Sequence, residues 1–137
     1  MTSDTPRKTT LVAGYDGSDG AAAAVRWAAA RTSPAGRLVV VCAAHPTAPR
    51  AAAQARAERA RAGLEALWMT EEGLVDADVQ LLVADAEPAE ALCRAAQEAG
   101  ADGIVVGRHH AGPFSANTVR QLLDVADRPV TVVPPST

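Results

Sequence analysis

The chain has few aromatic residues, two cysteines and a single lysine, Lys8. Aromatic residues make up 3% of its 137 residues, whereas hydrophobic residues make up 48%. The core must therefore consist mainly of alanine, valine and leucine. Cys42 and Cys93 lie far apart and show no metal-type spacing, so neither a metal site nor a disulfide framework is indicated. We expect both to be packing residues, one in a strand and one in a helix, in a reducing cytoplasm.

The sequence also lacks targeting, membrane and nucleic-acid signals. Residues 1–10 are polar and contain no apolar segment of the kind that signal peptides carry. No apolar run approaches the length of about 18 residues that a membrane-spanning helix needs. The formal net charge of −3 argues against a broad nucleic-acid surface. We therefore expect a cytoplasmic domain at residues 9–135, preceded by a disordered tail at residues 1–8, that binds neither membranes nor nucleic acids.

What the chain does contain is a regular alternation of short apolar runs and alanine-rich amphipathic stretches. The apolar run at residues 37–44 is typical of a parallel strand that is covered on both faces. This alternation predicts a single-domain, doubly wound α/β fold with right-handed crossovers. We expect a five-stranded parallel sheet in the order 3-2-1-4-5, with helices on both faces. The expected strands are residues 10–15, 37–44, 78–84, 103–106 and 129–133, and the expected helices are residues 20–31, 50–72, 85–100 and 115–125.

In sheets of this kind, ligands bind at the carboxyl ends of the strands where the winding reverses. The turn at Asp16, after the first strand, and the loop at Gly107, after the fourth, should therefore face each other. Glycine lets a backbone approach a ligand closely, and the helix that follows offers unpaired N–H groups to an anion. This loop, however, carries Arg108, His109 and His110 where a phosphate cradle would have small residues.

Four segments together resemble the universal stress protein domain: LVAGYDGSDGAAAAVRWAA, RLVVVCAAH, ADGIVVG and ADRPVTVVP. The opening Asp-Gly-Ser and the closing Arg-Pro-Val-x-Val-Val-Pro are weak signals alone and fairly specific in combination. The resemblance covers Thr10 to Pro134. It implies a Rossmann-like fold, a dimer made through the last strand, and membership of a family that contains both ATP binders and proteins that do not bind ATP.

ATP-binding members resemble one another in a loop written G-x2-G-x9-G-[ST], and this chain departs from that pattern. Gly107 matches its first glycine, and His110 stands at the second, although Gly112 is close by. Ala116 and Asn117 stand at the final two positions. Gly107 and Ala116 are nine positions apart, where the pattern requires thirteen. The lost glycines and the lost length both weaken a triphosphate cradle, so the resemblance implies a degenerate ATP-binding loop.

Other positions of that nucleotide site are kept. Asp16 matches an acid of the family, and the resemblance implies that this acid contacts the ribose or the adenine edge. Ala43 matches a position whose backbone, by the same resemblance, contacts adenine. The start of the fourth helix could hold one phosphate, with a charge-assisted contact from Arg108. A competing interpretation makes Asp16 a turn residue that bonds backbone N–H groups. The candidate cofactor-binding residues for ATP or AMP are Asp16, Ala43, Gly107, Arg108, Gly112, Asn117 and Thr118.

No set of residues supports catalysis. No Ser/His/Asp or Cys/His set has suitable spacing. His109 and His110 are adjacent, so they point in opposite directions in an extended loop, and no acid or cysteine lies within the next few residues to complete a metal shell. A receiver-like regulatory domain would be phosphorylated at Asp16 or Asp85. It would also need a second acid beside Asp16 and a lysine after the last strand, and both are missing.

Two functions follow from these observations. The first is a non-catalytic, universal-stress-type regulatory domain with a weakened or lost nucleotide site, which acts as a homodimer and binds an unidentified protein partner. The dimer would form through the exposed edge strand at Val130–Val133, with pairing limited by Pro129 and Pro134. The alternative is an ATP- or AMP-binding stress sensor that uses the shortened loop.

Overall fold

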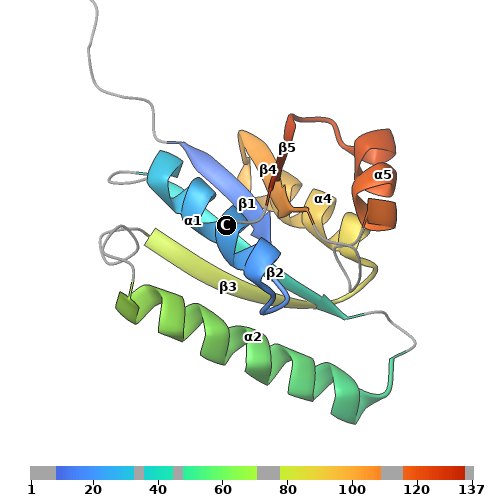
Figure 1. Cartoon of the computed structure of the whole chain (residues 1–137). Helices are drawn as coiled ribbons and strands as arrows, with labels where there is room; N and C mark the ends of the chain where they lie inside the picture. Colours follow the sequence, from blue (N-terminus) through green and yellow to red (C-terminus); the bar gives the residue numbers. More distant parts are fainter. Residues whose placement is uncertain (1–8, 33–35, 45–47, 71–77, 109–115, 135–137) are drawn as a thin grey trace, which may run out of the picture.

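The computed structural model describes residues 9–32, 36–44, 48–70, 78–108 and 116–134, with only the backbone for Ala44, Ala116 and Asn117. The elements alternate along the chain as expected (Figure 1). The strands are β1 (Thr10–Gly14), β2 (Arg37–Ala44), β3 (Asp78–Asp85), β4 (Gly103–Gly107) and β5 (Val130–Val133). The helices are α1 (Asp19–Thr32), α2 (Arg50–Thr70), α4 (Pro88–Ala99) and α5 (Ala116–Val125).

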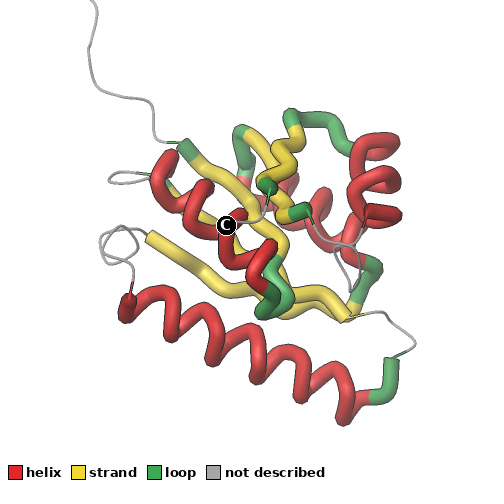
Figure 2. Tube along the Cα trace, in the orientation of Figure 1, coloured by secondary structure: helices red, strands yellow, loops and turns green. Residues whose placement is uncertain are grey.

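All five strands are parallel and lie in the order β3-β2-β1-β4-β5, which confirms the predicted topology. The helices α1 and α2 pack on one face of the sheet, and α4 and α5 pack on the other (Figures 1 and 2). The winding reverses between β1 and β4, so the carboxyl ends of these two strands flank the switch point.

Alternate residues of each central strand supply two separate cores. In β2, Leu38 and Val40 belong to the cluster under α1 and α2, whereas Val39 and Val41 belong to the cluster under α4 and α5. All four are buried. Burying each such side chain contributes about 1.5–3 kcal/mol. A strand that contributes to both cores must be apolar on both faces, which explains the nearly continuous apolar run that follows Arg37 in β2.

The helices begin and end at residues suited to those positions. In α2, the apolar positions Ala60, Leu64 and Leu67 are buried, as their spacing predicts. Pro88 opens α4, where its missing N–H costs nothing. Gly100 ends α4 in the left-handed conformation with φ of 61°.

The hydrogen bonds between strands fix which residues of β5 face outward. Ile104 N donates to Pro129 O and Arg108 N donates to Val133 O, both at 2.9 Å. Odd-numbered residues of β5 therefore bond β4, because backbone groups alternate sides along a strand. Val130 and Val132 direct their N–H and C=O groups away from the sheet.

The same argument applies to β3 at the opposite edge. Arg37 N donates to Thr9 O at 3.0 Å, so odd-numbered residues of β2 bond β1 and even-numbered residues bond β3. With Leu38 opposite Val79 in the register, the even-numbered residues of β3 bond β2. The outward backbone groups of β3 therefore belong to Val79, Leu81, Val83 and Asp85. No backbone group of the described residues pairs with them outside the sheet.

Candidate functional site

The turn after β1 forms the first side of the switch point. Asp16 Oδ1 accepts a hydrogen bond from Ser18 N at 3.0 Å, and Gly17 has φ of 88°, which suits glycine. Ser18 Oγ then accepts a bond from Ala21 N at 3.2 Å and so caps α1. Asp16 therefore holds the turn, as its structural interpretation predicts, and this turn starts α1 beside the sheet. A ligand role for Asp16 stays a prediction.

Tyr15, which is not among the candidate site residues, lies at the base of this turn. Its N–H donates to Val41 O at 2.9 Å, and its side chain is buried under α2. The Tyr15 hydroxyl lies so close to Gly63 that a Cβ there would collide with it. Burial raises the pKa of this hydroxyl, and the adjacent Asp16 raises it further. A glycine inside an otherwise alanine-rich helix was the sequence signal for this contact.

Gly107, at the end of β4, is glycine because of close packing. A Cβ on Gly107 would overlap the carbonyl oxygen of Gly20, in the first turn of α1. The sequence suggested ligand approach as the reason for this glycine. The structure gives a second reason, the contact between β4 and α1. The next residue, Arg108, bonds β5 through its N–H and exposes its side chain.

The structure brings some of the candidate residues together. Asp16, Ala43 and Gly107 lie at the carboxyl ends of the neighbouring strands β1, β2 and β4. Ala43 is buried on the α4 and α5 face. Thr118 is buried in the first turn of α5. Asn117 lies in the same turn, where only its backbone is described, and Gly112, His109 and His110 lie outside the described residues.

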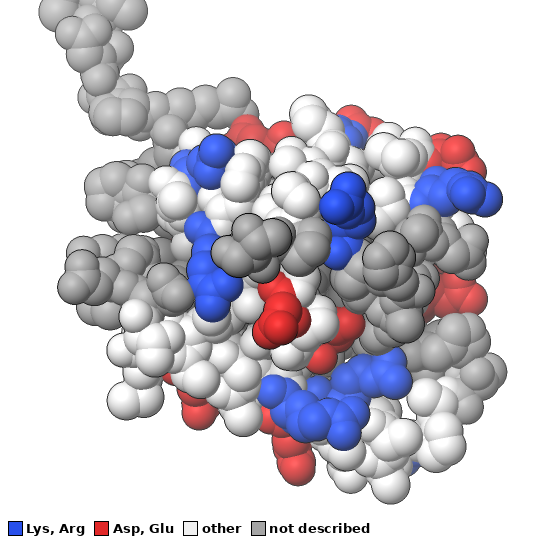
Figure 3. Space-filling model, in the orientation of Figure 1, with Lys and Arg blue, Asp and Glu red and all other residues white. Residues whose placement is uncertain are grey.

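The charges on the face that carries α1 and α2 are mixed. Figure 3 shows arginine and acidic side chains interspersed there, with arginines gathering over α2. That helix also carries Glu58 and Glu65, both exposed, which agrees with a solvated helix surface. In the described part of the chain, no helix is long and apolar enough to cross a membrane. No group of three or more potential metal-binding side chains occurs among the same residues.

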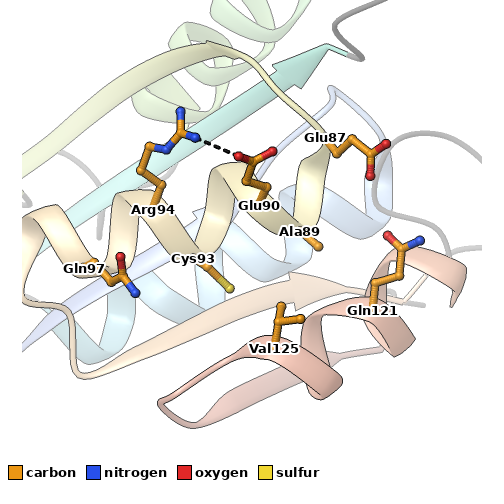
Figure 4. A pocket seen from close by; sticks show the side chains of 8 residues that line it. All are labelled: Glu87, Ala89, Glu90, Cys93, Arg94, Gln97, Gln121 and Val125. Carbon is orange, nitrogen blue, oxygen red and sulfur yellow. Dashed lines mark hydrogen bonds and ion pairs between the residues drawn. The ribbon is translucent and has the colours of Figure 1, made fainter.

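A hollow of about 540 Å³ lies between α4 and α5, away from the strand ends. Figure 4 shows Cys93 pointing into it from α4, opposite Val125 of α5. Cys93 is partly exposed rather than fully buried, because its position on α4 faces this hollow. Burial raises the pKa of the Cys93 thiol, and Asp127 raises it further, which disfavours a reactive thiolate. Cys42 is buried, as expected, and burial raises its pKa as well.

Comparison with known proteins places the chain and its fold in one family. The sequence profile of the universal stress protein family matches residues 8–134. The chain belongs to the universal stress protein family. No curated protein gives a significant match to the chain.

Solved structures of universal stress proteins agree with this assignment. A universal stress protein in complex with cAMP is 27% identical, with a TM-score of 0.62 over 94% of this chain and 98% of that one. A family member from Burkholderia pseudomallei is also 27% identical, with a TM-score of 0.71 over 94% of this chain and 97% of that one. The Archaeoglobus fulgidus protein in complex with dAMP shares the fold at 20% identity, with a TM-score of 0.72 over 93% and 98%.

Proposed function

We propose that this universal stress domain is a non-catalytic regulator whose switch-point site takes an adenine nucleotide with one phosphate in place of Mg-ATP. The observation that carries the proposal is a mismatch between two halves of the site. The strand ends that carry Asp16, Ala43 and Gly107 are adjacent. The loop from Gly107 to Ala116, in contrast, spans nine positions and is too short for the ATP pattern.

The nucleoside half has the chemistry for a base and a ribose. Asp16 offers carboxylate oxygens at the end of β1, and the end of β2 offers backbone groups near Ala43. The first turn of α5, with Asn117 and Thr118, supplies helix N–H groups, which suit one phosphate. The related protein solved with cAMP carries a ligand with a single phosphate group.

We propose further that the domain acts as a homodimer through β5. Val130 and Val132 direct their backbone groups outward, and a second copy can satisfy them by antiparallel pairing. The next outward position is Pro134, which has no N–H to donate, so pairing ends there. Such a dimer joins two sheets and leaves both switch points at strand ends outside the interface.

Isothermal titration of the nucleotide-stripped protein with AMP, cAMP, ADP and Mg-ATP tests the ligand. We expect AMP or cAMP to bind with a Kd in the micromolar range, about 8 kcal/mol, and Mg-ATP at least about tenfold more weakly. Tighter binding of Mg-ATP would support the sensor alternative with a working short loop. No heat with any nucleotide at millimolar concentration would contradict the site.

A matched pair of variants separates the ligand role of Asp16 from its turn role. Asp16→Asn keeps an oxygen that can accept from Ser18 N but exchanges the second carboxylate oxygen for an amide. We expect it to weaken AMP binding about tenfold, or about 1.4 kcal/mol, with little change in thermal midpoint. Asp16→Ala should lower both the affinity for AMP and the thermal midpoint. Unchanged AMP affinity in Asp16→Asn would show that Asp16 only stabilises the turn and does not contact the ligand.

A further inference from the structure

The β3 edge of the sheet is long and uncovered by the described helices. Its eight residues direct the backbone groups of Val79, Leu81, Val83 and Asp85 outward. α2 packs over β2, and α4 packs over β2 and β1, so neither helix is centred on β3. Val83 is 47% exposed. Figure 1 shows β3 as the outermost strand on this side.

Because the helices sit over β2, a groove runs beside β3 on each face of the sheet. On the α2 face, a cavity of about 270 Å³ is lined by Arg61, Leu64, Glu65, Trp68, Val79 and Leu81. On the α4 face, a cavity of about 200 Å³ is bordered by Leu82, Ala91, Ala95 and, on the outside, Arg94 and Glu98. Each groove thus has an apolar floor and one charge of each sign.

Two grooves flanking one free edge suit an added strand. Side chains of an extended peptide alternate between the two faces of a sheet, so successive residues would enter the α2 groove and the α4 groove in turn. Main-chain hydrogen bonds to the outward groups of Val79, Leu81 and Val83 would supply affinity, and the grooves would supply specificity. We propose that the β3 edge binds an extended segment of a partner protein by strand addition.

The charges at the two ends of β3 define the chemistry of that segment. Asp78 and Asp85 are both exposed, lie seven positions apart and therefore project from opposite faces. β3 itself carries no basic residue. A complementary segment has alternating apolar residues bounded by lysine or arginine, since opposite charges on facing residues stabilise a strand pair. A second copy of β3 brings two more aspartates and no counter-charge, so the charges favour a different protein over self-pairing.

This binding mode is separate from the nucleotide site and from the β5 edge. The backbone groups involved are at the far side of the sheet, beyond β2 from the switch point. Loss of nucleotide binding therefore leaves the proposal of strand addition at β3 intact. The nucleotide-site proposal and the β3 proposal can each fail without the other.

The test uses a fluorescein-labelled peptide of eight residues, with lysine at both ends and valine and threonine alternating between them. The two lysines lie opposite Asp78 and Asp85 in either strand direction. Fluorescence anisotropy with the full-length protein should show saturable binding. Val83→Pro, which removes an outward N–H, should weaken binding at least tenfold. Val83→Thr, which keeps that N–H and the side-chain shape, should change it less than twofold.

Two N-methylated peptides provide a control on the ligand. Methylation of the residues whose N–H groups face β3 should abolish binding, whereas methylation of the alternate residues should not. By NMR hydrogen exchange, the amides of Val79, Leu81 and Val83 should gain protection, and the amide of Leu82, which already bonds β2, should not.

Several results would overturn the proposal. One is the absence of peptide binding at millimolar protein, and another is equal binding of both methylated peptides. A third is loss of peptide binding in Val132→Pro with full binding in Val83→Pro, which would place the site at β5. A fall in molar mass on light scattering of Val83→Pro would also overturn it, because the β3 edge would then join two copies of this chain.

Discussion

The two outer strands of the sheet differ in length, charge and flanking residues. β5 has four uncharged residues, VTVV, between Pro129 and Pro134. β3 has eight residues, DVQLLVAD, and carries an aspartate at each end. On β5, two residues direct their backbone groups outward, Val130 and Val132. On β3, twice as many do so, Val79, Leu81, Val83 and Asp85.

An exposed edge pairs with whatever strand fits it, and proteins control this pairing with prolines and charges. On β5 the prolines restrict pairing to a short uncharged segment, which a second copy matches. β3 contains no proline, and its two terminal aspartates are the charges that we propose select its partner. The two proposals together assign self-association and partner binding to opposite edges of one sheet.

The largest expected effect is the loss of the dimer when the β5 edge is blocked. Val132→Pro removes an outward N–H without removing a hydrogen bond to β4, so it should convert the dimer to a monomer. Light scattering at matched concentrations measures the molar mass. Val132→Thr keeps the N–H and should remain dimeric.

The matching change on the other edge sharpens the comparison. Val83→Pro should leave the molar mass of the dimer unchanged while it blocks peptide binding at β3. If Val132→Pro stays dimeric, or Val83→Pro is the variant that becomes monomeric, the proposed division between the two edges is wrong.

The sequence predicted the fold well because the signals of the fold are local. The apolar run of β2, the buried positions of α2 and the strand order all agree with the structure. Ser18 Oγ bonds the first turn of α1, as serine before an alanine-rich helix commonly does. Element ends differ by one to three residues, and α4 begins at Pro88 rather than at residue 85. Tyr15, for example, lies just beyond β1, and Gly107 belongs to β4.

The features that sequence reasoning missed depend on contacts between distant segments. The position of a Gly107 Cβ is blocked by Gly20, a residue 87 positions earlier in the chain. The outward direction of Val83 and Val132 depends on strand register, which sequence alternation alone does not fix. The grooves beside β3 arise because α2 packs over β2 and α4 packs over β2 and β1, and no short motif encodes that placement.

A smaller effect, on thermal stability, is expected from two arginine side chains that form hydrogen bonds near the two edges of the sheet. Next to β5, Arg128 Nη1 donates to the carbonyl oxygens of Ala96 and Ala101, both at 2.8 Å. Next to β3, the exposed guanidinium of Arg37 donates to the side chain of Gln80. Arg128→Ala leaves a part-buried carbonyl without its donor and should lower the thermal midpoint by about 4 °C or more. Arg37→Ala should lower it by less than about 2 °C.

The pH dependence of the difference in thermal midpoint between Arg128→Ala and Arg37→Ala identifies the cause of that difference. A hydrogen bond from Arg128 lowers the pKa of Asp127, so this ion pair stabilises the fold above the unfolded pKa and is lost as pH falls through the folded pKa. The two carbonyl bonds do not titrate. The loss of thermal midpoint in Arg128→Ala should therefore persist as the pH falls below the folded pKa of Asp127. Its disappearance there would assign the effect to the exposed pair with Asp127.

The smallest expected effect tests the charges that select the partner of β3. Replacing both aspartates, Asp78→Lys and Asp85→Lys, should reverse the preference of this edge from lysine-ended to glutamate-ended peptides. Exposed ion pairs contribute about 0.2–1 kcal/mol each, so affinity should change by about twofold to fivefold per end. The preference should diminish as salt is added, because both carboxylates are exposed. Asp78→Asn with Asp85→Asn should remove the preference without reversing it. If all three proteins bind both peptides equally, the aspartates do not select the partner, and only the backbone groups and grooves of β3 remain to define it.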